Sequence, residues 1–429
     1  MTGGLLLYFL LNQIEGGRTL SLRGFLKSGH WPTLLGSFLY FDTSFMVWVL
    51  MGATSVFVAE DFGLSASQKG ILVALPILGG AFFRLFLGVM ADRIGARKAS
   101  IMGMVLSMIP LLLLWLAGRT LPEVYAYGFL LGIAGASFAA ALPLTSRWYP
   151  KKYQGLAMGI AGAGNSGTLL STLFAPRLAE AFGWHAVFGI AMLPMALVLG
   201  TFMIIAKAPP QQAEVKKTAS YLTVLKVPEA WLFCFFYSIT FGGFVGMSSF
   251  LPVFFRDQYG LAPITVGDYV TICVLAGSFV RPFGGWIADR VGGISVLKVL
   301  FGCIALLFVG VALLMPFYAE MIVLFLVMAA LGLGNGAVFQ LVPQRFGHEI
   351  GVMTGLVGAA GGVGGFLLPT LLGVLKGWSG TFASGYVLVG GIALVAGVVI
   401  HLMGKQWQRK NKDSMEKVTS SPLAALRNS

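Results

Sequence analysis

The sequence predicts an all-α membrane protein with twelve transmembrane helices in two pseudo-symmetric six-helix bundles. Three observations lead to this fold class. The 429 residues are 57% hydrophobic and only 10% charged, which is more apolar surface than one water-soluble core can hide. Apolar stretches of about 18 or more residues recur along almost the whole chain, each long enough to cross a hydrocarbon layer about 30 Å thick. Finally, a segment of the first half is repeated in the second.

The apolar stretches and the polar breaks between them set the expected helices. These helices lie near residues 33–58, 69–91, 99–117, 121–145, 153–178, 185–206, 230–255, 264–288, 295–316, 319–342, 350–375 and 382–404. The longest polar break divides them six and six. We therefore expect a cytoplasmic N-terminal segment 1–32, an N-terminal bundle 33–206, a cytoplasmic linker 207–229, a C-terminal bundle 230–404 and a basic cytoplasmic tail 405–429.

The net charge of +13 follows from membrane topology rather than from nucleic-acid binding. When both termini are placed in the cytoplasm, most lysines and arginines fall on the cytoplasmic side, as the positive-inside rule requires. The opposite side receives only Lys69, Arg119, Arg177, Arg256 and Lys376. We expect a multi-pass protein of the cytoplasmic (inner) membrane that contacts the lipid bilayer and no nucleic acid.

The two halves share a repeated segment. Residues 81–95 match residues 278–292 at 8 of 15 positions, and duplication is the simplest explanation. A parallel repeat of six-helix halves places a shared site near the bilayer midplane, where one half can rock against the other. This architecture is typical of secondary transporters.

Each copy of the repeat ends in a charged loop. The residues are Gly88, Asp92, Arg93, Gly95, Arg97 and Lys98 in the first copy, and Gly285, Asp289, Arg290 and Gly292 in the second. Both copies resemble the loop motif of the major facilitator superfamily, G-x-x-x-D-R-x-G-x-[RK]-[RK]. An Asp and an Arg at these helix ends can pair with neighbouring helix termini and hold one conformation closed, so we expect a conformational-switch loop here.

Two arginines lie inside the predicted membrane helices. Arg84 and Arg281 each precede the motif aspartate by eight residues, which places them about 12 Å inward from the helix end. An arginine at that depth costs at least ~2.5–3.5 kcal/mol and needs a compensating charge. Asp42 is the only carboxylate clearly inside an apolar stretch, so buried ion pairs cannot compensate both. The favoured compensator is a bound small monovalent oxyanion, and the alternative is a structural Arg–carboxylate pair.

Two predicted helices are rich in glycine at helical spacing, residues 155–167 and 351–365. Together with the two arginines they resemble the nitrate/nitrite porter family (NarK and NasA type) of the major facilitator superfamily, over roughly residues 30–405. In that family the paired arginines bind the anion and the glycine stretches are nitrate signatures. The resemblance implies these roles for Arg84, Arg281, Gly162, Gly164, Asn165, Gly358, Gly361 and Gly362.

The resemblance extends to aromatic and polar side chains. Tyr237 and Phe241 match a family substrate segment, and Phe138 matches the opposing aromatic ring. Phe138 and Phe241 would then sandwich a flat anion such as nitrate. Asn335 and Gln340 are further polar candidates for the site. Because glycine and aromatic stripes also serve ordinary helix packing, that reading stays open.

Energy coupling remains open at the level of sequence. Moving one negative charge inward against 100 mV costs ~2.3 kcal/mol, so uniport would expel nitrate. Proton symport is the favoured mode, with Asp42 as the proton-coupling candidate and hydrogen-bonded helix packing as its alternative role. Nitrate/nitrite antiport is the alternative mode. We expect a monomeric transporter rather than an enzyme, with no catalytic residues, cofactor or metal. The rival functions are transport of another small organic anion and anion sensing without translocation.

Overall fold

The computed structural model describes residues 14–15, 18–19, 22–209, 224–346 and 350–419. Ten helical segments in this part of the chain are long and apolar enough to span a membrane. Nine of these segments are single helices. The first seven are α6 (Ala66–Arg93), α7 (Ala96–Leu116), α12 (Trp184–Ile205), α14 (Pro228–Tyr259), α15 (Pro263–Val291), α16 (Gly293–Ala312) and α17 (Phe317–Arg345). Two more are α18 (Ile350–Ser379) and α19 (Ala383–Thr419), and the tenth is formed by α8 (Leu121–Gly135) and α9 (Phe138–Ser146).

Two predicted spans, the first and the fifth, are divided into shorter helices. The first consists of α3 (Trp31–Trp48), α4 (Leu50–Ala53) and α5 (Ser55–Asp61). The fifth consists of α10 (Lys151–Gly162), the 3₁₀ turn η1 (Ala163–Ser166) and α11 (Gly167–Phe182). Mid-helix 3₁₀ turns often mark functional sites or hinges, and a hydrophobicity pattern does not reveal them because such a short turn leaves the long apolar stretch recognisable on both sides.

Outside the spans, the helix α2 (Leu22–Ser28) precedes α3, and the strands β1 (Ile14–Glu15) and β2 (Arg18–Thr19) form a short antiparallel pair. The last helix, α19, continues well past the predicted end of its span at residue 404. Most of the predicted linker, most of the predicted N-terminal segment before residue 22 and the last ten residues lie outside the described residues.

Local sequence explains where several helices begin. Ser65 and Gln68 form a reciprocal capping box at the start of α6, so two main-chain N–H groups that lack helical partners are satisfied. Gly95 and Gly292 precede α7 and α16 with φ of 91° and 86°. Residues other than glycine rarely adopt this region of φ, which explains why the repeated loop carries glycine at the same place in both copies.

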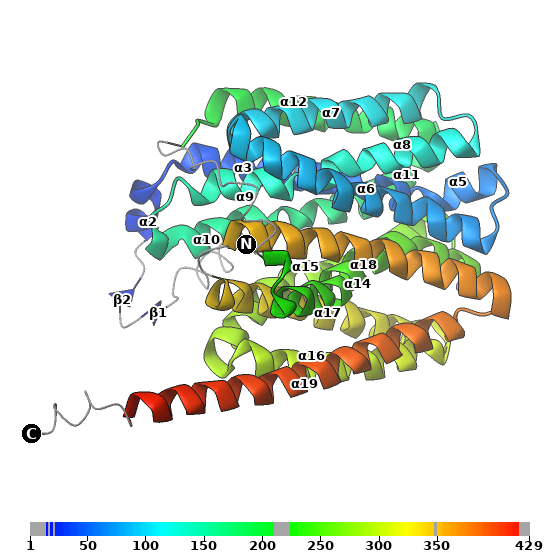
Figure 1. Ribbon diagram of the computed structural model, residues 1–429. Helices are drawn as coiled ribbons and strands as arrows, with labels where there is room; N and C mark the ends of the chain where they lie inside the picture. The colour runs from blue at the N-terminus through cyan, green and yellow to red at the C-terminus, as the bar shows by residue number, and fades with distance from the viewer. Residues whose placement is uncertain (1–13, 16–17, 20–21, 210–223, 347–349, 420–429) are drawn as a thin grey trace, which may run out of the picture.

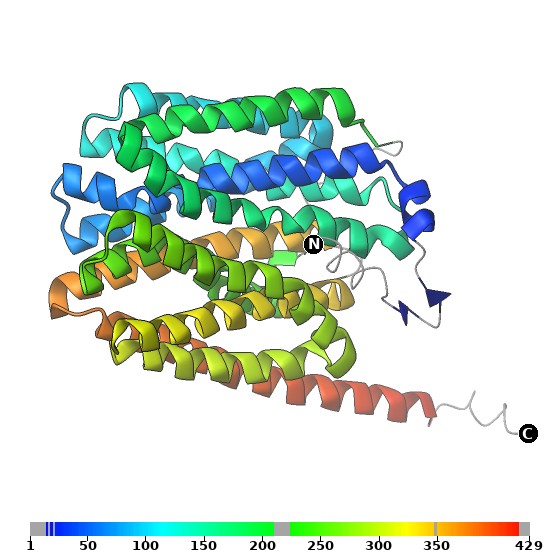
Figure 2. The same cartoon turned by 180° about the vertical axis from the view of Figure 1, so that it is seen from behind.

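The helices up to α12 stack on one side of the molecule and those from α14 onward on the other, with α6 and α18 meeting between them (Figures 1 and 2). We call these groups the N-half and the C-half. The end of the bundle with the turns at Gly95 and Gly292 is the motif end, and α2 lies there too (Figure 1). The opposite end carries the turns at Gly63, Gly183 and Gly260.

Candidate functional site

Arg84 lies on α6, is only 3% exposed and faces the junction of the two halves. Its Nη1 donates a hydrogen bond to the carbonyl of Gly358 on α18, in the C-half. Its Nη2 donates to the carbonyl of Gly135 in the N-half, at 2.8 Å, and its Nε has no partner among the described residues. Main-chain carbonyls therefore hold the guanidinium in place from both halves, but they carry no charge that neutralises it.

The acceptor at Gly135 becomes available because the fourth span breaks between α8 and α9. In a regular helix the N–H of Ala139 would donate to Gly135. Here it donates to Ala136 instead, at 2.9 Å, which leaves the Gly135 carbonyl to Arg84. The break thus creates the binding partner of a buried arginine.

Arg281 lies on α15 and is half-buried. Its Nη2 lies 3.4 Å from the Tyr237 hydroxyl oxygen, and its guanidinium carbon lies 5.8 Å from the centre of the Phe339 ring. Arg84, Arg281 and Tyr237 are close enough to interact electrostatically. The repeat therefore brings one arginine from each half to a common site, as the sequence predicts.

Neither arginine forms an ion pair with a carboxylate in the described part of the chain. Asp42, the one acidic candidate from the sequence, accepts a hydrogen bond from the Ser166 hydroxyl at 2.6 Å and another from the main-chain N–H of Gly167. It therefore ties α3 to the η1 turn of the fifth span. Asp42 is partnered, but not by an arginine.

The structure buries a second carboxylate, at a helix end, that the sequence analysis did not single out. Glu320, in the first turn of α17, is completely buried. However, its Oε2 accepts the N–H of Met315, and it precedes Phe339 on the same helix by a distance of about 29 Å at 1.5 Å per residue. It closes a loop at the opposite end and leaves both arginines uncompensated.

Aromatic rings surround the Arg84 guanidinium. Its central carbon lies 5.7 Å from the ring centre of Trp48, 5.6 Å from that of Phe138 and 5.7 Å from that of Phe241. All three lie within the ~6 Å at which a cation is attracted to a ring face. Phe138 and Phe241 thus both contact the arginine that would hold the anion, and Phe241 stacks on Tyr237 with centres 5.0 Å apart.

The glycines of the two signature helices take different positions. The carbonyl of Gly358 binds Arg84. A Cβ atom on Gly361 would lie 2.7 Å from the Tyr237 ring, and one on Gly362 would lie 2.8 Å from Ala81 on α6. Gly164 packs on Phe41 and Asp42, whereas a Cβ on Gly162 would meet nothing within 4 Å. Most of these glycines therefore allow backbones and rings of the site to approach closely.

The amide candidates divide into two groups. Asn165 in η1 and Asn335 on α17 are buried, and the Oδ1 atom of each lacks a hydrogen-bond partner. Gln340 lies beside Gly293 at the motif end, where its Oε1 would be 2.6 Å from a Cβ placed on that glycine. The structure therefore places Gln340 at the motif-end turn, about one and a half helical turns beyond Asn335.

The first loop motif makes the helix-end contacts that the sequence predicts. Asp92 pairs with Arg147 at the end of the fourth span, at 3.0 Å. Arg97 donates to the carbonyls of Ala206 and Met203 at the end of α12, where a cation is favourable. In the second copy Arg290 instead lies over the ring of Trp286, 3.9 Å from its centre, and Asp289 is exposed.

Sequence reasoning missed two aromatic residues of the site, Trp48 and Phe339. Phe339 lies against Arg281 and makes edge contacts with Tyr237 and Phe138, at 4.9 and 6.0 Å. Trp48 is the last residue of α3 and faces Arg84. Neither belongs to a recognisable motif, and a large aromatic residue by itself does not distinguish a binding site from ordinary helix packing.

Comparison with known proteins places the chain. The family model of the Major Facilitator Superfamily matches residues 36–369. A nitrite extrusion protein of Bacillus subtilis is 30% identical over 377 residues, which cover 88% of this chain and 95% of that protein. The chain belongs to the nitrate/nitrite porter family of the major facilitator superfamily. It is accordingly a membrane transporter and not an enzyme.

Further relatives in this family are similar over most of their length. A probable nitrate/nitrite transporter NarK2 of Mycobacterium tuberculosis is 33% identical, covering 77% of this chain and 85% of its own. A probable nitrate/nitrite antiporter NarK1 of Thermus thermophilus is 30% identical, covering 85% and 90%. The crystal structure of a bacterial homologue of the human lysosomal transporter Spinster matches with a TM-score of 0.65 at 16% identity, over 87% of this chain and 96% of that one. The major facilitator fold is confirmed.

Proposed function

We propose that this transporter moves nitrate, and also nitrite, across the cytoplasmic membrane by alternating access. The observation that carries the proposal is a pair of arginines inside membrane-spanning helices, one from each half, without a carboxylate partner among the described residues. The names of the relatives point to the same two anions.

The chemistry of the site favours a small, flat anion. Arg84 is surrounded by three ring faces and keeps its Nε free, while Arg281 adds a second planar donor group near the Tyr237 hydroxyl. Guanidinium groups bind planar oxyanions through paired N–H donors. Apolar rings exclude water, so they favour an ion that is weakly hydrated. Nitrate and nitrite combine both properties.

The distribution of ion pairs indicates which end of this conformation is closed. At the opposite end three pairs join the N-half to the C-half: Lys69–Asp257 at 2.7 Å, Glu60–Arg256 at 2.7 Å and Arg177–Asp268 at 2.6 Å. Of the ion pairs described at the motif end, Asp92–Arg147 and Glu229–Arg345 each lie within one half. With the motif end in the cytoplasm, these three cross-half pairs are the outer lock that holds this state shut towards the outside.

We assign proton symport as the favoured mode, with Asp42 as the proton carrier. Asp42 is largely enclosed and contacts the η1 turn that also carries Asn165, so a change at the anion site has a short path to its carboxyl group. Nitrate/nitrite antiport is the alternative mode. It is electroneutral, and it is favoured by the name of the Thermus thermophilus relative.

Counterflow in proteoliposomes tests the function and separates the modes. Labelled nitrate is supplied outside, with nitrite or buffer inside, and with or without an acid-outside pH gradient. Acceleration by internal nitrite at equal pH means antiport, and uptake that needs the pH gradient means symport. If neither condition moves nitrate faster than protein-free liposomes do, the proposal is wrong. The remaining candidate functions would then be transport of another small organic anion and anion sensing without translocation.

A further inference from the structure

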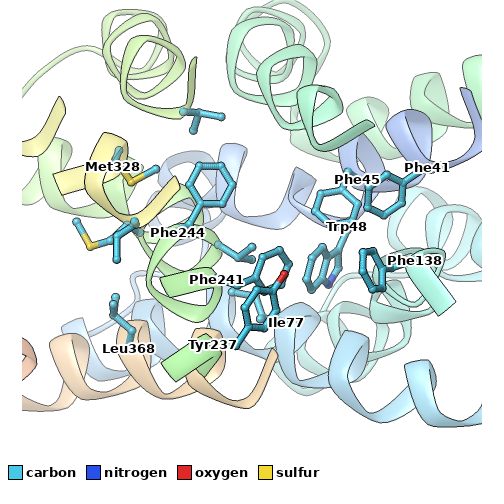
Figure 3. Packing of buried hydrophobic residues seen from close by; sticks show 14 of the residues in the cluster. Phe41, Phe45, Trp48, Ile77, Phe138, Tyr237, Phe241, Phe244, Met328 and Leu368 are labelled. Carbon is cyan, nitrogen blue, oxygen red and sulfur yellow. The ribbon is translucent and has the colours of Figure 1, made fainter. Parts of the chain in front are cut away.

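Trp48 is the one ring around Arg84 to which neither the loop motif nor the family signature assigns a role. It is the last residue of α3, it is 1% exposed, and its ring centre lies 5.7 Å from the guanidinium carbon. Figure 3 shows its indole between the ring of Phe138 and the stacked rings of Tyr237 and Phe241.

Contacts with Pro76, Phe45 and two glycines hold the indole in place. Its Nε1 donates a hydrogen bond to the carbonyl of Pro76 on α6, at 2.7 Å. Phe45 meets it edge-on, with ring centres 5.0 Å apart. Gly80 and Gly135 lie against its faces, and a Cβ atom on either would come within 2.7 or 2.3 Å of indole atoms. Only glycine fits at these two positions while the ring stays in place.

These contacts connect Trp48 to Arg84 by two routes. The first is direct, because the ring face lies towards the guanidinium in a site without bulk water, where cation–π attraction is strongest. The second runs through Gly135, whose Cα packs on the indole and whose carbonyl accepts Nη2 of Arg84. The Trp48 side chain therefore covers one side of the guanidinium and also holds in place the glycine whose carbonyl accepts its hydrogen bond.

We propose that Trp48 is a positioning residue for Arg84, fixing the plane of its guanidinium so that the remaining N–H donors point at the transported anion. This inference rests on the anion site proposed above. A Trp48 that served only to pack the first, second and fourth spans would fix the helices without setting the affinity for the anion. The two roles are separable because they respond differently to a change in ring electronics.

The test measures nitrate binding to the purified protein by calorimetry, with thermal unfolding as a check on folding. Trp48→Leu removes the ring, and Trp48→Phe keeps a smaller ring without the N–H. We expect nitrate affinity to fall roughly tenfold in Trp48→Leu and less in Trp48→Phe. Trp184→Leu is the matched control, because Trp184 is also buried and bonded through its Nε1, but to Asp61 at the opposite end. Its nitrate affinity should not change.

A second measurement isolates the electronic contribution. Replacing all tryptophans by 5-fluorotryptophan keeps the shape of each ring but weakens its attraction for a cation. Fluorination should lower nitrate affinity severalfold in the natural sequence and leave it unchanged in Trp48→Phe. Equal affinities in the fluorinated and unfluorinated protein, or a Trp48→Leu variant that binds nitrate normally, would overturn the positioning role. Failure of the unaltered protein to bind nitrate would instead refute the proposed function.

Discussion

Arg84 shows how one residue connects composition to function. A buried guanidinium held only by carbonyls retains its full charge, and the three rings around it keep water away. Removing such a charge from water is costly unless a partner arrives. The two carbonyl contacts satisfy part of the hydrogen-bonding capacity of Arg84, and its uncompensated charge is the reason we propose that it binds an anion.

Replacing Arg84 with lysine should weaken nitrate binding by roughly tenfold or more. Lysine keeps the charge but lacks the planar fork, so it cannot satisfy Gly358, Gly135 and an anion together. Calorimetric titration with nitrate measures the change. Arg119→Lys, an exposed arginine at the opposite end, is the control and should bind normally. Unchanged affinity in Arg84→Lys would contradict recognition by the guanidinium fork.

Replacing Asp42 with asparagine should separate anion transport from proton coupling. Asparagine still accepts the Ser166 hydrogen bond through its Oδ1, so the contact with η1 survives. We expect exchange of nitrate for nitrite to continue, and the acceleration of uptake by an acid-outside gradient to disappear. Flux in proteoliposomes at several pH gradients measures this, with Asp61→Asn as a control. Full pH-dependent uptake in Asp42→Asn would remove the residue from the coupling mechanism.

At the scale of elements, the breaks in the first, fourth and fifth spans have the greatest consequence. The α8–α9 break frees the Gly135 carbonyl, the end of α3 places Trp48, and the η1 turn presents Ser166 to Asp42. At the breaks in the fourth and fifth spans, side chains of neighbouring helices bond the freed main-chain groups, Arg84 at the Gly135 carbonyl and Asp42 at the Gly167 N–H. The site is built from these irregular turns.

Two glycines of the fifth span should respond oppositely to alanine. A Cβ on Gly167 would lie 1.8 Å from the carbonyl oxygen of Asp42, whereas one on Gly162 would meet nothing within 4 Å. Gly167→Ala should therefore destabilise the protein by about 1–3 kcal/mol, and Gly162→Ala should be neutral or slightly stabilising. Thermal unfolding in detergent compares them. Equal unfolding temperatures would mean that α3 and the fifth span pack less closely than described.

At the scale of the whole molecule, the two halves meet along α6 and α18, and the outer lock fixes their relative position at one end. A Cβ on Gly70 of α6 would lie 3.1 Å from the Cα of Gly373 on α18, so the backbones themselves touch there. Rocking about such close contacts needs only a few cross-half interactions to change. The three ion pairs of the outer lock are cross-half interactions of this kind, and we expect them to break when the halves rock.

Reversing one charge of the outer lock should open that end. Because partly exposed ion pairs contribute about 0.2–1 kcal/mol each, Asp257→Lys should raise the outward-open population roughly two- to fivefold. The combined Lys69→Asp and Asp257→Lys exchange should restore it. Distances between spin labels on the loops after α5 and α14 report the change, and Glu229→Gln at the motif end is the control. A combined variant as open as the single one would refute pairing at this position.

The sequence alone determined the fold class, the family and the central pair of arginines. These follow from composition, from the length of apolar stretches and from a repeated segment, all of which depend on the membrane as solvent rather than on detailed packing. Arg84 and Arg281 were identifiable because a charge in an apolar stretch is costly wherever it points.

The tertiary structure alone decided which groups hold those arginines and which ion pairs join the two halves. Trp48, Phe339 and the carbonyls of Gly135 and Gly358 carry no local signal, because an apolar residue or a peptide group reads the same in every helix. The cross-half ion pairs join residues that are far apart in sequence, as Lys69 and Asp257 are. Such contacts exist only once the helices have packed, since hydrophobicity fixes which segments enter the membrane but not which faces meet there.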